Sequence, residues 1–165
     1  MQKTVSGVRD GAGVRYRERL SPSLWAIVSA TVAAPMAALV IAPIDTTFAL
    51  LVGGLVAIGI VALMIAASPL VDVHGGVLTA GRAHIDVAFT GDVAVLTGAD
   101  AQHARGPGLN PRSWHVIRGG IDGVVIVAIT DPDDPAPTWV ISSRTPDRLA
   151  SALRRAQATR RTPGR

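Results

Sequence analysis

The stretch that decides the fold runs from Leu24 to Val71, where two uncharged segments flank one aspartate. Residues 24–44 read LWAIVSATVAAPMAALVIAPI, residues 48–71 read FALLVGGLVAIGIVALMIAASPLV, and Asp45 lies between them. An α-helix rises about 1.5 Å per residue, so about 20 apolar residues cross the roughly 30 Å hydrocarbon core of a bilayer. The sequence therefore predicts a membrane protein with two transmembrane helices, over about 24–44 and 48–70.

The connector between the two segments predicts an antiparallel hairpin, because only Asp45, Thr46 and Thr47 separate the apolar runs. An aspartate or threonine at such a position caps the following helix by accepting a hydrogen bond from its first amides. We therefore expect residues 20–71 to form a transmembrane hairpin. The alternative for the first segment is a cleaved signal peptide. It is disfavoured because the apolar run exceeds the roughly 7–15 residues typical of such peptides, and a second span follows.

Basic residues lie next to the outer ends of the two apolar segments and are absent from the connector between them. Arg15, Arg17 and Arg19 precede the first segment, Arg82 follows the second, and the connector contains none. Since Lys and Arg concentrate in cytoplasmic loops, we expect a multi-pass protein of the inner (plasma) membrane with both termini in the cytoplasm. The predicted membrane-interface residues are Arg15, Arg17, Arg19 and Trp25.

Composition narrows the class of function. The 165 residues include no cysteine, and the net charge is +4. The absence of cysteine excludes disulfides, thiol nucleophiles, iron–sulfur clusters and cysteine zinc sites. Residues 72–165 contain eleven Arg and nine Asp, which is near balance, so no nucleic-acid partner is expected. Because no motif of a nucleophile, phosphate-binding loop or metal site occurs, we expect no catalytic residue, metal or cofactor, and no enzyme.

From Asp72 onward, short β-branched runs separated by glycine and proline predict a small α+β domain over residues 72–157. Thr145 is expected to cap a final helix that begins at Pro146. Residues 1–19 and 158–165 are expected to be a basic cytoplasmic tail and a basic disordered tail. The other expected elements are a hairpin over 76–86, a strand or helical turn over 92–96, a loop over 98–112, and strands over 114–117, 123–129 and 138–142.

Five short segments spread over residues 14–156 form a pattern. They are YRERL at 16–20, GVLTAG at 76–81, TDPDDP at 130–135, PTW at 137–139 and SSRTP at 142–146. With these segments the chain resembles an actinobacterial family of uncharacterised membrane proteins, defined only as a domain of unknown function. Its C-terminal part is similar to bacterial PH-like domains, which implies a bent antiparallel sheet closed by a C-terminal helix. The resemblance implies no activity. Thr138 stands where an aromatic residue is expected before Trp139.

Candidate binding residues each have a plain structural alternative. Trp114, Trp139 and Arg144 are candidates for a groove that binds peptide or lipid, but tryptophans on strands are typical of a sheet core. Residues 142–144 precede the last helix, whose N-terminus attracts anions, yet a strand end with a helix cap is the favoured interpretation. The aspartates between residues 131 and 134 are favoured as a turn over a cation site, because the flanking prolines fix the backbone.

The basic C-terminal end offers a second candidate surface. Its arginines either contact anionic lipid or belong to a solvated tail. The candidate lipid-contacting residues are Arg154, Arg155, Arg160 and Arg161. The favoured hypothesis is a non-enzymatic inner-membrane protein in which the lipid bilayer anchors a PH-like domain that binds a protein partner or an anionic headgroup. The alternative is an accessory subunit of a membrane transport or cell-envelope complex, with another membrane protein as the partner of the spans.

Overall fold

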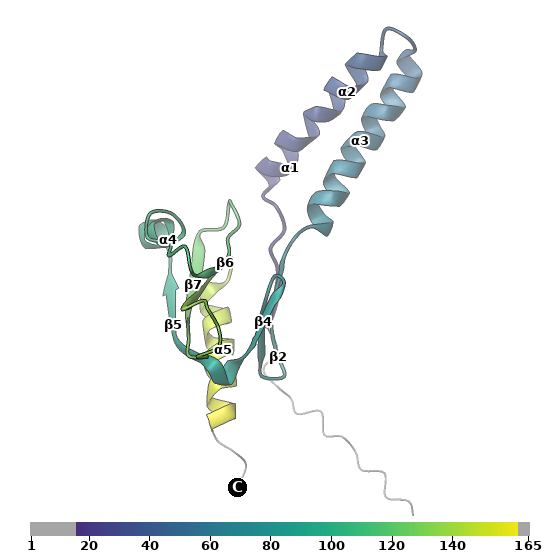
Figure 1. Cartoon of the computed structure of the whole chain (residues 1–165). Coiled ribbons are helices and arrows are strands. Elements are labelled where there is room, and N and C mark those ends of the chain that lie inside the picture. Colours follow the sequence, from purple (N-terminus) through teal and green to yellow (C-terminus); the bar gives the residue numbers. More distant parts are fainter. Residues whose placement is uncertain (1–15, 162–165) are drawn as a thin grey trace, which may run out of the picture.

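In the computed structural model, which describes residues 16–161, a helical hairpin projects from one end of a two-sheet domain (Figure 1). Its first arm consists of α1 (Leu24–Thr31) and α2 (Ala33–Ile41), and its second arm is α3 (Thr46–Ala66). The first arm is interrupted at Val32, one turn before Pro35. Proline cannot donate the backbone hydrogen bond to the preceding turn, and its ring crowds the carbonyl there, so an interruption at this place is expected.

Both arms begin at side-chain caps, and both end earlier than the sequence predicts. Ser23 Oγ accepts from Ala26 N at 3.2 Å, and Asp45 Oδ1 accepts from Phe48 N at 2.8 Å, which confirms Asp45 as a cap. The first arm ends at Ile41 rather than residue 44, and α3 ends at Ala66 rather than residue 70. Prolines at 43 and 69 explain both differences, because the residue before a proline disfavours the helical conformation.

The rest of the described chain forms two four-stranded sheets with three further helical segments. The first sheet has the spatial order β1 (Tyr16–Arg19), β2 (Leu70–His74), β3 (Val77–Ala80) and β4 (Ala83–Asp86). The second has the order β5 (Thr90–Leu96), β7 (Gly123–Ile129), β8 (Thr138–Ser143) and β6 (Trp114–Val116). The helical segments are η1 (Val87–Phe89), α4 (Gly98–Arg105) and α5 (Pro146–Arg161).

The hairpin is an insertion into the first sheet. β1 precedes the hairpin and β2 follows it, and the two strands pair antiparallel, with Tyr16 opposite Val73 and Arg19 opposite Leu70. The pairing continues to Leu20, whose N–H donates to the Pro69 carbonyl at 2.9 Å. The predicted division into a tail over 1–19 and a domain beginning at 72 is therefore wrong at residues 16–19 and 70–71. These residues belong to the domain.

Two further expectations are corrected. The predicted bent antiparallel sheet is instead two sheets, and the second includes a parallel pair, β6 with β8, in which Trp114 lies opposite Trp139. The predicted loop over 98–112 contains α4, which buries Ala104 and packs Ala101 against Val124 and Val140 of the second sheet. Alanines contribute little apolar signal, so the periodicity of this helix is weak in the sequence.

The main core lies between the two sheets and α5. Leu149 and Leu153 of α5 are fully buried, in a cluster that includes Leu20, Val71 and Ile141. The two strands over 123–129 and 138–142, the hairpin over 76–86 and the helix beginning at Pro146 are confirmed. A small α+β domain closed by a C-terminal helix is therefore correct at the level of fold class.

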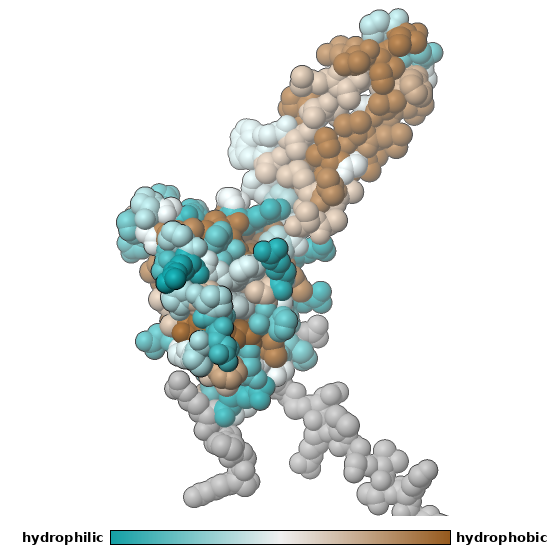
Figure 2. Space-filling model, in the orientation of Figure 1, coloured by the Kyte–Doolittle hydropathy of each residue, from teal (hydrophilic) through white to brown (hydrophobic). Residues whose placement is uncertain are grey.

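The hairpin carries almost all of the exposed apolar surface of the described chain. Fifteen of the sixteen large apolar side chains that are exposed lie between Leu24 and Ile65, and Ile44 at the far tip is 86% exposed. Figure 2 shows this contrast, with the hairpin largely brown and the domain largely teal. By length and composition, both arms are able to cross a membrane.

The two arms contact each other through Gly53. A Cβ built on Gly53 would lie 3.0 Å from Ala38 Cβ and 3.2 Å from the Ala34 carbonyl, whereas a Cβ on neighbouring Gly54 meets nothing within 4 Å. We expect Gly53→Val to force the arms apart and to cost about 1–3 kcal/mol, as overpacking usually does. Gly54→Val is the matched control. Thermal unfolding of the full chain in detergent micelles measures the effect, and equal midpoints for the two variants would contradict the contact.

Candidate functional site

A groove of about 740 Å³ lies where α3 passes into β2. We call it the base groove. The Gly81 N–H donates to the Leu70 carbonyl at 2.8 Å, which holds the β3–β4 turn beside the end of α3. β6 provides the opposite wall. The groove is lined chiefly by Ser68, Pro69, Leu70, Gly81, Arg82, Trp114, His115 and Arg118.

Trp114 lines the base groove, and three contacts fix its ring. Its Nε1 donates to the Ala80 carbonyl at 3.2 Å, and its ring packs against Trp139 with the centroids 6.4 Å apart. Above it, the Arg82 guanidinium carbon lies 5.3 Å from the ring centroid, within the range of a cation–π interaction. This stacking holds the Arg82 guanidinium against a wall of the groove.

The base groove is electropositive. Arg82 and Arg118 supply two guanidinium groups and His115 an imidazole, and no carboxylate is among the lining residues. Arg118 is held at the backbone, where its N–H donates to Ser142 Oγ at 3.2 Å. Guanidinium groups bind phosphate and carboxylate groups through paired hydrogen bonds. The arrangement is therefore suited to an anion.

Two other arginines fasten the hairpin to the domain. Arg19 Nη2 donates to the Ile65 carbonyl at 3.1 Å and reaches the Ala66 carbonyl at 3.5 Å, so a cation meets two carbonyls of the last turn of α3, where the helix dipole is negative. Arg144 Nη2 donates to the Ser21 carbonyl at 2.7 Å. Both residues thus fix the root of the hairpin, next to the base groove.

The predicted interface residues are found in different places. Arg19 lies at the root of the hairpin, and Trp25 is 80% exposed at the start of α1. Arg17 lies on β1 and lines a different groove. Arg15 lies outside the described residues.

The predicted groove of Trp114, Trp139 and Arg144 does not form. Trp114 lines the base groove, but Trp139 is only 2% exposed and belongs to the core, and Arg144 binds the segment before α1. Sequence reasoning missed His115 and Arg118 and used Arg82 only to predict topology. Only the parallel β6–β8 pairing and the β3–β4 turn bring them together.

The sequence favoured a strand end with a helix cap over an anion site at residues 142–144, and in the structure a carboxylate of the protein itself, that of Glu18, binds there. Glu18 Oε1 accepts from Arg144 N at 2.8 Å, and Glu18 Oε2 accepts from Ser143 Oγ and Tyr16 Oη, each at 2.6 Å. Burial, together with the hydrogen bond to Glu18, raises the pKa of the Tyr16 hydroxyl above its ordinary value of 10.0. Tyr16 is therefore neutral at physiological pH and donates to the carboxylate.

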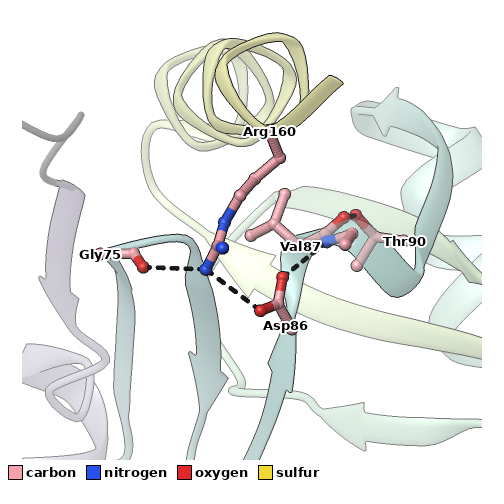
Figure 3. A network of polar contacts seen from close by, with 6 residues as sticks. Gly75, Asp86, Val87, Thr90 and Arg160 are labelled. Carbon is pink, nitrogen blue, oxygen red and sulfur yellow. Dashed lines mark hydrogen bonds and ion pairs between the residues drawn. The ribbon is translucent and has the colours of Figure 1, made fainter. Parts of the chain in front are cut away.

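The candidate lipid-contacting arginines near the C-terminus lie toward the opposite end of the domain. α5 lies within the domain and runs away from the hairpin (Figure 1). Arg160 Nη2 contacts Asp86 Oδ2 at 3.1 Å and the Gly75 carbonyl at 3.4 Å, as Figure 3 shows. Arg154 donates to the Val93 carbonyl at 2.7 Å. These two side chains therefore hold α5 to the sheets, which corrects their expected role. Arg155 lines the same groove as Arg17, and the side chain of Arg161 lies outside the described residues.

The aspartates between residues 131 and 134 form a turn. Asp131 Oδ1 accepts from Asp133 N at 3.0 Å, and Asp134 Oδ1 accepts from Ala136 N at 2.8 Å. Over residues 16–161, no three His, Asp or Glu side chains gather in a way suited to a metal ion.

Taken together, these features define a class of protein: a small α+β domain interrupted by an apolar helical hairpin, with a basic groove where the two parts meet. The chain belongs to the family described as "Protein of unknown function (DUF3093)", whose model matches residues 15–153. None of the curated proteins and none of the solved structures matches it.

Proposed function

We propose that the chain is a non-enzymatic protein of the inner membrane, with the hairpin across the bilayer and both termini in the cytoplasm. The exposed apolar surface of the hairpin supports insertion, because each large apolar side chain removed from water contributes about 1.5–3 kcal/mol. The position of Arg19 at the root of the hairpin supports the orientation. The two sheets closed by α5 are compatible with a PH-like domain.

In this arrangement the base groove lies at the level of the lipid headgroups. Its function is to bind the phosphate of an anionic lipid, with Arg82 and Arg118 as the ligands and Trp114 as the interfacial aromatic residue. The single observation that carries the proposal is the charge of the groove, which contains two arginines and no carboxylate beside the end of α3. Arginines near an anionic leaflet contribute about 1 kcal/mol each.

The test is lipid retention by the full chain in detergent, measured by native mass spectrometry with added phosphatidylglycerol or phosphatidylcholine. We expect phosphatidylglycerol to be retained preferentially. The double variant Arg82→Gln/Arg118→Gln should weaken its retention about tenfold or more, since about 2 kcal/mol is removed. Arg112→Gln, an exposed arginine that does not line the groove, is the control.

Equal retention of the two lipids, or no effect of the double variant, would refute the lipid function.

The accessory-subunit function is the second candidate. A shallow groove of about 420 Å³ between α2 and α3 supports it, since Ala38, Ala42, Ala49 and Gly54 allow close approach of another helix. Co-purification with another membrane protein, without lipid preference, would favour this candidate.

A further inference from the structure

A second groove, of about 810 Å³, runs along the flank of the domain between β1 and α5. We call it the flank groove. It shares no lining residue with the base groove. Its charged lining residues are Arg17 on β1, Arg144 at the β8–α5 junction, Arg148 and Arg155 on α5, and the acidic Glu18 and Asp147.

Three of these arginines have no partner in the described part of the chain. The side chains of Arg17, Arg148 and Arg155 make no hydrogen bond or ion pair with another described residue. Within the described residues neither acid of the groove forms an ion pair with these arginines: the Glu18 carboxylate accepts from the Arg144 N–H and from two hydroxyl groups, and Asp147 forms no ion pair. The anion-binding capacity of the flank groove is assigned to the arginine side chains that line it.

The arginines lie along a line that leads away from the hairpin. Arg144, Arg148, Ser151 and Arg155 are spaced four, three and four residues apart, which places Arg148, Ser151 and Arg155 on one face of α5. Arg144 is bound at the root of the hairpin, and α5 runs from there toward the opposite end of the domain (Figure 1). Since α5 begins at Pro146, a rise of about 1.5 Å per residue carries the helix about 13–14 Å from its first residue to Arg155.

This length determines the kind of ligand. With the hairpin in a bilayer, as proposed above, the headgroup region on each side is only about 5–8 Å thick. A lipid headgroup that reaches Arg144 therefore does not reach Arg155. An extended peptide rises about 3.3 Å per residue, so about five residues cover the whole line.

We propose that the flank groove binds an extended acidic peptide segment of a partner protein, with its carboxylates paired to Arg17, Arg148 and Arg155. Carboxylates form paired hydrogen bonds with guanidinium groups, and the pairs are sensitive to salt where they are exposed. The surface is distinct from the lipid site, so the domain holds a partner at its side while the hairpin fixes it at the membrane.

The experiment uses the full chain in nanodiscs of phosphatidylcholine, a neutral lipid, and a fluorescent hexaglutamate peptide followed by anisotropy. Hexaglutamate is expected to bind and hexaglutamine is not, with affinity falling as salt is added. The double variant Arg148→Gln/Arg155→Gln should weaken binding about tenfold, since an exposed pair contributes a factor of a few and two are removed. Arg82→Gln/Arg118→Gln is the matched control, because it removes two arginines from the other groove.

Unchanged binding in the flank-groove variant, or equal loss in both double variants, would overturn the proposal. So would a flank-groove variant that loses phosphatidylglycerol retention while keeping its affinity for hexaglutamate. The lipid function can fail independently of this proposal. In that case the full chain would show no preference for phosphatidylglycerol but would still bind hexaglutamate. Arg148 and Arg155 are exposed, and exposed substitutions usually change stability by less than about 0.5 kcal/mol. The variants are therefore expected to fold.

Discussion

A fragment of residues 72–165 is expected to remain unfolded, although it includes six of the eight strands in full and all of α5. It lacks Leu20 and Val71, which are fully buried in the main core. It also lacks Glu18, which binds Ser143 and Arg144. Removing a buried leucine side chain costs about 2–5 kcal/mol. The combined loss, with β1 also absent, approaches the roughly 5–15 kcal/mol of total stability typical of a domain.

The matched comparison is the full chain with residues 21–68 replaced by a four-residue Gly-Ser linker. Leu20 and Pro69 are already joined by a backbone hydrogen bond of 2.9 Å, so a short linker closes β1 and β2 into an ordinary hairpin. We expect this variant to be soluble and to unfold cooperatively. Near-ultraviolet circular dichroism, which reports the packing of Trp114 and Trp139, distinguishes the folded linker variant from the unfolded fragment. A cooperatively folded 72–165 fragment would show that β1 is dispensable.

Elements whose signals are local were predicted well. β7, over Gly123–Ile129, is rich in β-branched residues, with four in succession at 124–127, and its bounds agree with the prediction. The start of α5 was predicted because Thr145 and Pro146 are typical of a helix start. The two apolar arms were predicted from length and charge, and their ends differ only where prolines at 43 and 69 set them.

Elements that depend on distant partners were missed. β1 is four residues long and reads YRER, so its arginines were interpreted only as positive charges next to the first apolar segment. The alternation of Tyr16, Glu18 and Leu20 with arginines was the available signal, because period-two alternation is typical of a strand with one buried face. The base groove had no such signal. It depends on the parallel placement of β6 beside β8, which neighbouring residues do not specify.

Replacing Glu18 with alanine is expected to cause the largest loss of stability of any single substitution considered for this chain. Its carboxylate accepts three hydrogen bonds, from Arg144 N, Ser143 Oγ and Tyr16 Oη. Ser143 is fully buried, so without Glu18 its hydroxyl loses its charged acceptor and keeps only the Tyr16 hydroxyl, 3.1 Å away, and the Thr145 N–H that donates to it. Hydrogen bonds to charged groups contribute about 1.5–3 kcal/mol each, and partial exposure of the site lowers the sum to about 2–4 kcal/mol.

Thermal unfolding of the full chain in detergent micelles measures this loss, with an expected decrease in the midpoint of about 10 °C or more. Glu18→Gln should be intermediate, because its amide keeps one acceptor oxygen but directs N–H groups toward donors. Asp122→Ala is the control. The Asp122 side chain is 93% exposed and reaches Arg105 only at 4.0 Å, so its loss should leave the midpoint nearly unchanged. If Glu18→Ala behaved like Asp122→Ala, Glu18 would not join β1 to the start of α5, and the integration of the hairpin into the first sheet would rest on the strand pairing and Leu20 alone.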